Sequence, residues 1–145
     1  MPCTPKSVVT ILNSLNINLE GMNVVVIGRS NIVGKPVGAL LLKENCTVTM
    51  CHSKTKNLRE VCKRSDILVV AIGKAKFIDD SFVKEGTIVI DVGTNSVQGK
   101  ITGDVDFDKV IDKASFVTPV PGGVGALTTT LLMKNACEAI EKYED

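Results

Sequence analysis

The sequence predicts an α/β fold, a single domain built on a doubly wound, mainly parallel sheet. Short runs of almost wholly apolar residues recur along the chain, which is typical of strands that are buried on both faces. Segments with helical periodicity separate these runs, and such alternation predicts a parallel sheet with helices on its faces. With 145 residues, the chain has the length of one domain and can bury a core.

A helix is expected over residues 4–15. Thr4 can cap it, and Pro5 suits its first turn, where the missing N–H would have no partner in any case. One face of this helix is apolar. Another amphipathic helix is expected at about 126–142, and both stand outside the alternating core. Their apolar faces are therefore expected to pack against each other or against a partner domain.

The other elements alternate along the middle of the chain. Helices are expected at 34–45 and 58–64, and a hairpin or irregular excursion at 99–105, followed by a turn capped by Asp106. Strands are expected at 23–27, 46–51, 66–72, 87–92 and 115–120, the last of which is stopped by Pro119 and Pro121.

The composition excludes several classes of function. The net charge is +1, so nothing indicates a broad attraction to nucleic acid or to an anionic membrane. Only 3% of the residues are aromatic, which argues against stacking on bases. The five cysteines are scattered and odd in number, which favours small buried thiols in a reducing cytoplasm. No apolar run approaches the ~20 residues of a membrane span, and no signal peptide is evident.

The main functional signal lies in four turns. In a parallel sheet, ligands bind beyond the carboxyl ends of the strands. Polar or glycine-rich turns follow four of the expected strands: GRSN at 28–31, HSKT at 52–55, GTN at 93–95 and TPVPGGVGA at 118–126. We therefore expect these turns to converge on one edge of the sheet.

The first turn departs from the dinucleotide fingerprint G-x-G-x-x-G. Ser30 stands at the place of the second glycine, and Gly34 falls one residue late. Gly28 permits a tight turn, and the helix that follows offers unpaired N–H groups to an anion. An ordinary strand–helix turn explains this stretch equally well when it is taken alone.

The second turn favours NADP over NAD. An NAD-binding domain carries an acidic residue about 20 residues beyond the glycine turn, where it binds the ribose 2′-OH. His52, Ser53 and two lysines occupy this place, and Arg29 can approach from the first turn. A solvated basic turn is the alternative. His52, the only histidine, is expected to pack or to assist phosphate binding there, far from any hydride transfer.

The fourth turn has an unusual composition. Gly122, Gly123 and Gly125 define a loop that can approach a flat ring and bind a carboxamide or phosphate through its N–H groups, although a plain strand–helix connection is the alternative. Asp91 ends a strand and can orient the GTN turn, and Asp104 is expected in a turn. No paired carboxylates, Ser/His/Asp set or metal cluster is visible, so no catalytic or metal-ligating residue is assigned.

Together these motifs resemble the bifunctional methylenetetrahydrofolate dehydrogenase/cyclohydrolase family. They occur in the order and spacing of that family, from one end of the chain to the other. The matching pieces are PCTP at 2–5, VVIGRSNIVGKP at 25–36, CHSKT at 51–55, VIDVGTN at 89–95, GDVDF at 103–107 and TPVPGGVGALT at 118–128.

The resemblance implies an oxidoreductase and hydrolase of one-carbon metabolism. Such an enzyme oxidises 5,10-methylenetetrahydrofolate with NADP and hydrolyses the methenyl product, and its C-terminal domain is a Rossmann-type cofactor domain. By the resemblance, the residues expected to bind NADP are Gly28, Arg29 and Ser30 (pyrophosphate and 2′-phosphate), Ser53 with its neighbour His52 (2′-phosphate side), Thr94 (cofactor), and Gly122, Gly123 and Gly125 (nicotinamide and folate).

The chain also departs from the family pattern. Ser7 and Ala126 replace a usual glycine and proline, and Thr94 stands where isoleucine is frequent. Ala126 is expected to loosen the loop that, by the resemblance, lies nearest the folate.

The family's N-terminal domain, with its catalytic lysine and the tyrosine near it, has no counterpart in this sequence. We therefore expect residues 1–145 to be the cofactor domain alone, inactive or nearly so, with folate bound only when the other domain is present. The intact enzyme is expected to be a homodimer. Two alternatives are a stand-alone nucleotide-sensing module and the cofactor domain of another two-domain dehydrogenase, such as one acting on a shikimate-like acid. The order of GRS, HSKT and PGGVG argues against the latter.

Overall fold

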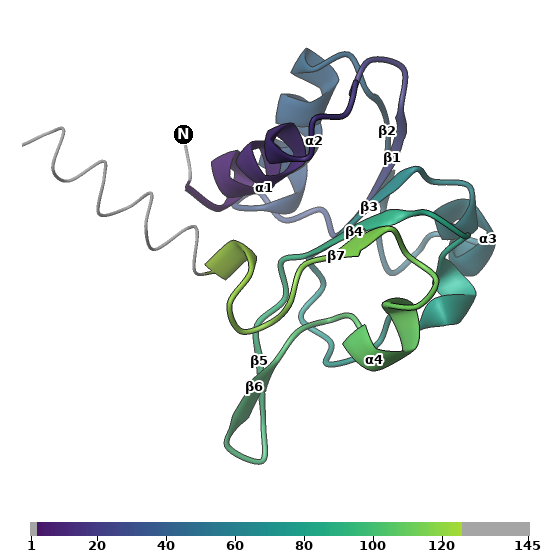
Figure 1. Ribbon diagram of the computed structural model, residues 1–145. Coiled ribbons are helices and arrows are strands. Elements are labelled where there is room, and N and C mark those ends of the chain that lie inside the picture. Colours follow the sequence, from purple (N-terminus) through teal and green to yellow (C-terminus); the bar gives the residue numbers. More distant parts are fainter. Residues whose placement is uncertain (1–2, 126–145) are drawn as a thin grey trace, which may run out of the picture.

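A five-stranded parallel sheet forms the centre of the fold. The computed structural model describes residues 3–125 (Figure 1). The strand order is β2-β1-β3-β4-β7, and every neighbouring pair is parallel. The predicted α/β class is confirmed. The strands are β1 (Asn23–Ile27), β2 (Thr47–Cys51), β3 (Ile67–Val70), β4 (Ile88–Asp91) and β7 (Phe116–Val117).

Helices cover both faces of the sheet, as a doubly wound fold requires. Alternate strand residues point to opposite faces. Val24 and Val26 lie in one buried cluster with residues of α1 and α2, whereas Val25 and Ile27 lie in another with residues of α3, η1 and α4. The helices are α1 (Cys3–Ser14), α2 (Gly34–Lys43), α3 (Leu58–Lys63), the 3₁₀ turn η1 (Asp80–Phe82) and α4 (Phe107–Val110).

The first helix differs from the sequence prediction in its N-terminus and in its packing partner. α1 begins at Cys3, so Thr4 lies inside the helix and is not its N-cap. Val8 and Leu12 are fully buried in the cluster that includes α2 and the sheet, so this helix does not present an unpartnered apolar face. It packs beside α2 on the same face of the sheet. The other outlying helix, expected at about 126–142, falls outside the described residues.

The connection between β4 and β7 contains no long helix. Its first part is an antiparallel hairpin of β5 (Asn95–Val97) and β6 (Lys100–Thr102), which extends away from the sheet (Figure 1). The hairpin expected at 99–105 therefore begins earlier in the chain. The single turn of α4 follows at the place of the expected turn, although the side chain of Asp106 does not cap it. Neither α4 nor η1 is long enough to show helical periodicity in the sequence.

Three of the cysteines are buried, unpaired thiols. Cys46, Cys51 and Cys62 all lie in the core, which confirms the interpretation of these three as small apolar residues. Burial, followed by the nearby Cys51, raises the pKa of Cys62 to about 12, so this thiol stays protonated. Within residues 3–125, the helices are too short or too polar to cross a membrane.

Candidate functional site

Two cavities open at the carboxyl ends of the parallel strands. The first, here called the β1–β3 cavity, has a volume of about 410 Å³. It is lined by Ile27, Gly28, Arg29, Ser30, His52, Ser53, Thr55, Leu58, Ala71, Ile72, Lys74 and Phe77. From β1 the chain runs to β2 on one side and returns to β3 on the other. The cavity therefore lies where the strand order reverses, which is the usual ligand site of open α/β sheets.

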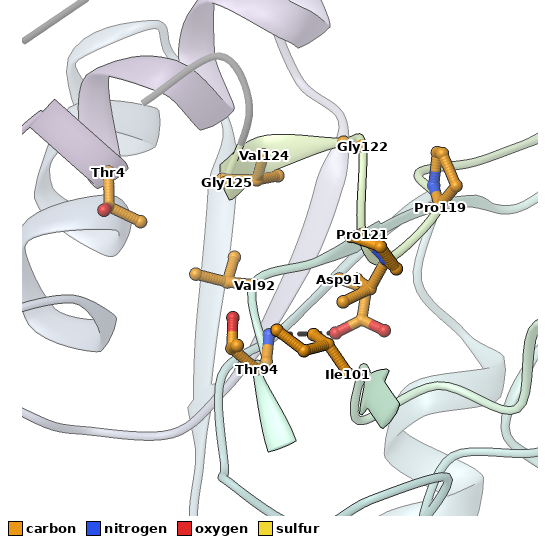
Figure 2. Close-up of a pocket in the computed structure, with 13 residues that line it drawn as sticks. Thr4, Asp91, Val92, Thr94, Ile101, Pro119, Pro121, Gly122, Val124 and Gly125 are labelled. Atoms are coloured by element: carbon orange, nitrogen blue, oxygen red, sulfur yellow. Dashed lines mark hydrogen bonds between the residues drawn. The ribbon is translucent and has the colours of Figure 1, made fainter. Parts of the chain in front are cut away.

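The second cavity, here called the β4–β7 cavity, has a volume of about 370 Å³ (Figure 2). It is lined by Thr4, Asp91, Val92, Gly93, Thr94, Ile101, Pro119, Val120, Pro121, Gly122, Gly123, Val124 and Gly125. Backbone and small side chains make up most of this wall. The cavity therefore suits a ligand that is held through main-chain groups and flat apolar contacts.

The first turn is compressed between two strands. Gly28 has a φ of +118°, and its N–H donates to the carbonyl oxygen of Cys51 at 2.9 Å. A Cβ atom at Gly28 would overlap the carbonyl group of Ala71, which follows β3. Only glycine meets both constraints.

Gly34, the glycine that falls one residue late in the fingerprint, allows α2 to pack closely onto this turn. A Cβ atom at Gly34 would overlap the carbonyl oxygen of Gly28. α2 begins at Gly34, as the sequence predicted. This residue therefore permits the close helix–strand approach that the third glycine permits in the common fingerprint, with the helix starting one residue later.

Ser30 closes the start of α2. Its Oγ accepts the N–H of Val33 at 3.1 Å and the N–H of Gly34 at 3.3 Å, and its carbonyl oxygen accepts the N–H of Lys35 at 3.0 Å. Both side-chain bonds use the oxygen as acceptor, so the hydroxyl hydrogen stays available to an anion in the cavity.

Two exposed polar side chains face the same cavity from different turns. Arg29 lines it from the first turn, and Ser53 lines it from the turn after β2. Arg29 forms no ion pair with another described residue. A guanidinium without a carboxylate partner is available to bind an anion.

His52 organises the turn after β2. The ring Nδ1 of His52 accepts the backbone N–H of Lys54 at 3.1 Å, and the backbone N–H of His52 donates to Thr55 Oγ1 at 2.8 Å. The N–H of Thr55 donates back to the carbonyl oxygen of His52 at 3.0 Å. These bonds hold Ser53 at the exposed tip of the turn, beside the β1–β3 cavity.

The third turn is held by Asp91, as the sequence suggested. Asp91 Oδ1 accepts the N–H of Gly93 at 2.9 Å (Figure 2, dashed line), and this bond sets the course of the chain into Thr94. Thr94 is exposed at the rim of the β4–β7 cavity. The N–H of Asp91 donates to Thr118 Oγ1 at 2.8 Å, which links this turn to the fourth.

The glycines of the fourth turn differ in what they permit. Gly122 has a φ of +106°, and a Cβ atom at Gly123 would overlap the carbonyl oxygen of Pro119. A Cβ atom at Gly125 would meet no atom of residues 3–125 within 4 Å. Gly122 and Gly123 are therefore required by the shape of the loop, whereas no described residue crowds the space beside Gly125.

The sequence did not reveal that Asp91 and Asp104 are buried together. Asp104 is fully buried, and its N–H donates to Asp91 Oδ1 at 3.1 Å. Loss of hydration raises the pKa of Asp91 to about 6. The charge of Asp104 adds to this rise, while the N–H groups that Asp91 accepts oppose it. The one sequence signal was a glycine near each carboxylate. A Cβ atom at Gly93 would overlap Asp104, and one at Gly103 would overlap Asp91.

The nine residues singled out from the sequence fall into two groups at one edge of the sheet. The β1–β3 cavity collects Gly28, Arg29, Ser30, His52 and Ser53, and the β4–β7 cavity collects Thr94, Gly122, Gly123 and Gly125. In the β1–β3 cavity these residues supply a guanidinium and hydroxyl groups, whereas in the β4–β7 cavity they supply mainly backbone groups. Such an arrangement suits an extended ligand with a phosphorylated end and a flat end. Within residues 3–125, no group of side chains has the make-up of a metal site.

Similarity to known proteins extends over the whole chain. A family model described as tetrahydrofolate dehydrogenase/cyclohydrolase, NAD(P)-binding domain, matches residues 2–144. A protein of Clostridium botulinum (strain Alaska E43 / Type E3), described as "Bifunctional protein FolD", is 74% identical over 145 residues, which is 100% of this chain and 51% of that protein. The chain thus spans about half the length of the curated relatives it matches.

Two solved structures are also similar. The bifunctional enzyme FolD, a methylenetetrahydrofolate dehydrogenase/cyclohydrolase from Campylobacter jejuni, is 45% identical, with a TM-score of 0.93 over 99% of this chain and 51% of that one. The methylenetetrahydrofolate dehydrogenase-cyclohydrolase (FolD) of Trypanosoma brucei, complexed with NADP cofactor and inhibitor, is 38% identical, with a TM-score of 0.90 over 99% of this chain and 51% of that one.

Proposed function

The chain belongs to the tetrahydrofolate dehydrogenase/cyclohydrolase family, as an NAD(P)-binding domain, and on this premise we propose that it binds NADP across its two cavities. One observation carries the proposal. The residues that the sequence singled out as cofactor ligands line two cavities at the carboxyl edge of one parallel sheet. The Trypanosoma brucei relative, 38% identical, is itself a complex with NADP.

The β1–β3 cavity is proposed to hold the adenosine end of the cofactor. Arg29 and Ser53 bind the 2′-phosphate, since a guanidinium and a hydroxyl both donate hydrogen bonds to phosphate oxygens. Gly28 and Ser30 adjoin the pyrophosphate, and His52 holds the turn that presents Ser53. None of the described residues that line this cavity is acidic, which favours NADP over NAD.

The β4–β7 cavity is proposed to hold the nicotinamide end. Thr94 and Gly122, Gly123 and Gly125 bring backbone close to the ring, and the carboxamide is bound by main-chain groups of these turns. Among residues 3–125, nothing fills the space beside Gly125, which leaves room there for a second molecule next to the ring. In the whole enzyme that molecule would be the folate.

We propose that the whole enzyme oxidises 5,10-methylenetetrahydrofolate with NADP and hydrolyses 5,10-methenyltetrahydrofolate. Residues 1–145 then form its cofactor domain, and folate binds only when a catalytic domain is present. The chain alone should be inactive or nearly so, because binding a cofactor does not replace acid–base groups that typically contribute about 10²- to 10⁴-fold each.

Two further parts of the proposal concern assembly and location. The intact enzyme is proposed to be a homodimer. Val97 and Ile101, two apolar side chains of the β5–β6 hairpin that are 45% and 51% exposed, support an interface there. Sedimentation of the intact enzyme, as wild type and as Val97→Asp, tests this point, since a monomer in both would overturn it. A reducing cytoplasm suits the buried, unpaired thiols of Cys46, Cys51 and Cys62.

Calorimetric titration with NADP and with NAD tests the proposal. We expect NADP to bind more tightly than NAD, and Arg29→Ala to weaken NADP about 10- to 100-fold, because a hydrogen bond to a charged group is lost. NAD affinity should change little. Arg64→Ala is the matched control, since Arg64 is exposed and lines a cavity that shares no residue with the β1–β3 cavity. Equal affinity for both cofactors, or no effect of Arg29→Ala, would overturn the 2′-phosphate assignment.

An activity assay tests the statement that the chain alone is inactive. NADPH formation from 5,10-methylenetetrahydrofolate is followed with the chain at high concentration. We expect no turnover above background. Clear turnover would show that residues 1–145 contain the acid–base groups and would overturn that part of the proposal.

A further inference from the structure

Asp104 joins the loops that line the two cavities. Its Oδ2 accepts the N–H groups of Ile72 at 2.8 Å and Gly73 at 3.0 Å, and its Oδ1 accepts the N–H of Lys74 at 2.9 Å. Ile72 and Lys74 line the β1–β3 cavity. One buried carboxylate therefore determines the course of the loop that follows β3.

The same carboxylate also reaches the loop after β4. Asp104 Oδ1 accepts the side-chain N–H of Asn95 at 2.9 Å. The N–H of Asp104 donates to Asp91 Oδ1, the atom that also accepts the N–H of Gly93. Gly93 and its neighbour Thr94 line the β4–β7 cavity. Hydrogen bonds thus run without a break from one cavity wall to the other.

This connection is tightly packed. Asp91 is 3% exposed, Asp104 is fully buried, and the glycines beside them leave no room for a Cβ atom. Hydrogen bonds to a carboxylate are strengthened by a surrounding of low dielectric constant. A close-packed interior also transmits small displacements, since it has no voids that absorb them. Such packing allows a shift of the 72–74 loop to reach residues 93–95.

We propose that Asp104 is a positioning residue that couples the two halves of the dinucleotide site. When the phosphorylated adenosine end binds in the β1–β3 cavity, it orders the 72–74 loop, and through Asp104 it also orders residues 93–95. The nicotinamide end then enters a wall that is already ordered, so its binding is more favourable. This inference rests on the proposed binding of NADP.

Hydrogen exchange of backbone amides, measured with and without 2′,5′-ADP, tests the coupling. This ligand contains the adenosine end of NADP and lacks the nicotinamide. In wild type we expect it to slow exchange at residues 28–30, at 72–74 and also at 93–95. If Asp104 had a merely structural role, 2′,5′-ADP would not slow exchange at 93–95, because these residues lie at the β4–β7 cavity, which the ligand does not enter.

Two variants and a control complete the experiment. In Asp104→Asn an NH₂ group replaces one carboxylate oxygen and faces N–H donors, which breaks the connection. In this variant we expect 2′,5′-ADP still to slow exchange at 28–30 but no longer to slow it at 93–95. Asn95→Ala removes the direct bond from the 93–95 loop to the carboxylate, together with the longer bond of the same NH₂ group to the carbonyl oxygen of Thr102, and leaves the connection through Asp91. The slowing at 93–95 should therefore be smaller than in wild type. In Asp106→Asn, the same charge change two residues away, the pattern should equal that of wild type, since Asp106 lines neither cavity.

The affinity for NADP gives a second measurement. Asp104→Asn should weaken it roughly 2- to 30-fold, the range seen when coupling residues are changed. The coupling would be overturned if 2′,5′-ADP slowed exchange at 93–95 in Asp104→Asn as much as it does in wild type. If Asp104→Asn does not fold, the same result in Asn95→Ala would overturn it. If wild type binds neither 2′,5′-ADP nor NADP, it is the proposed function that fails.

Discussion

Gly34 lies so close to Gly28 that a single added Cβ atom would overlap the carbonyl oxygen of the earlier glycine. The N-terminus of α2 therefore rests directly on the turn that follows β1. The atom in the way belongs to the backbone, and the turn that carries it is itself pressed against Ala71. This contact connects the stability of the helix with the shape of the β1–β3 cavity.

Gly34→Ala is expected to lower the free energy of unfolding by about 1–3 kcal/mol, the usual cost of overpacking, and to weaken NADP binding. Gly38→Ala is the matched control in the same helix. Its Cβ atom would meet the flexible end of the Met50 side chain, and alanine gains up to about 1 kcal/mol in helix propensity. It should therefore be neutral or stabilising. Urea unfolding measures both variants, and equal effects would contradict the close contact.

Ser30 has a structural and a proposed binding role that two substitutions can separate. Ser30→Ala removes the acceptor of the Val33 and Gly34 N–H groups and should cost about 1 kcal/mol of stability. Ser30→Asp keeps an acceptor at the start of α2 but places a negative charge where the phosphates of NADP are proposed to bind. We expect it to be more stable than Ser30→Ala and to bind NADP at least about tenfold more weakly than wild type. Tight NADP binding by Ser30→Asp would speak against phosphate at this turn.

The contribution of Asp91 to the free energy of unfolding should decrease as the pH rises. Its pKa is about 6 in the folded state and 3.8 as an ordinary carboxyl, so the folded protein binds the proton more tightly than the unfolded chain. The contribution of this group is therefore most favourable below pH 4. It declines by about 3 kcal/mol between pH 4 and pH 6 and is constant above that.

Asp91→Asn separates this effect from the rest of the protein, because carboxyls remote from Asp91 titrate equally in both proteins. The free energy of unfolding of wild type, minus that of the variant, should decrease by about 3 kcal/mol from pH 4 to pH 7. Urea unfolding at several pH values provides both quantities. A difference that is independent of pH would mean that Asp91 titrates as an ordinary carboxyl.

Asp66 should show the opposite pH dependence. The N–H of Asn23, followed by the ammonium group of Lys84 at 3.0 Å, lowers the pKa of Asp66. Its contribution is therefore present above the ordinary carboxyl pKa and is lost as the pH falls below it. Asp66→Asn should be less stable than wild type at pH 7, and this difference should vanish in acid.

Lys84→Met is the companion variant for Asp66. It removes only the exposed ion pair, so at pH 7 it should cost less than about 1 kcal/mol and less than Asp66→Asn. Thermal unfolding at pH 7 and at pH 3 measures both. If Lys84→Met were the more destabilising, the ion pair rather than the backbone hydrogen bond would dominate at Asp66.

Local patterns in the sequence predicted most of the sheet but not all of its surroundings. Each buried strand appears as a short apolar run, because both of its faces lie in the core. η1 and α4 were not predicted as helices, since three or four residues show no period. The apolar face of α1 was predicted correctly, but its partner was not, because periodicity tells which face is buried and not what covers it.

The sequence by itself determined the parallel sheet, the four turns at its carboxyl edge and the family, because these depend on residues close together in the chain and on their order. Only the tertiary structure decided what lies between the turns. Asp91 and Asp104 meet because the β5–β6 hairpin returns the chain to the end of β4, and Gly34 reaches Gly28 because α2 packs back onto β1. Such contacts depend on how the elements pack against one another, so they appear only once the chain is folded.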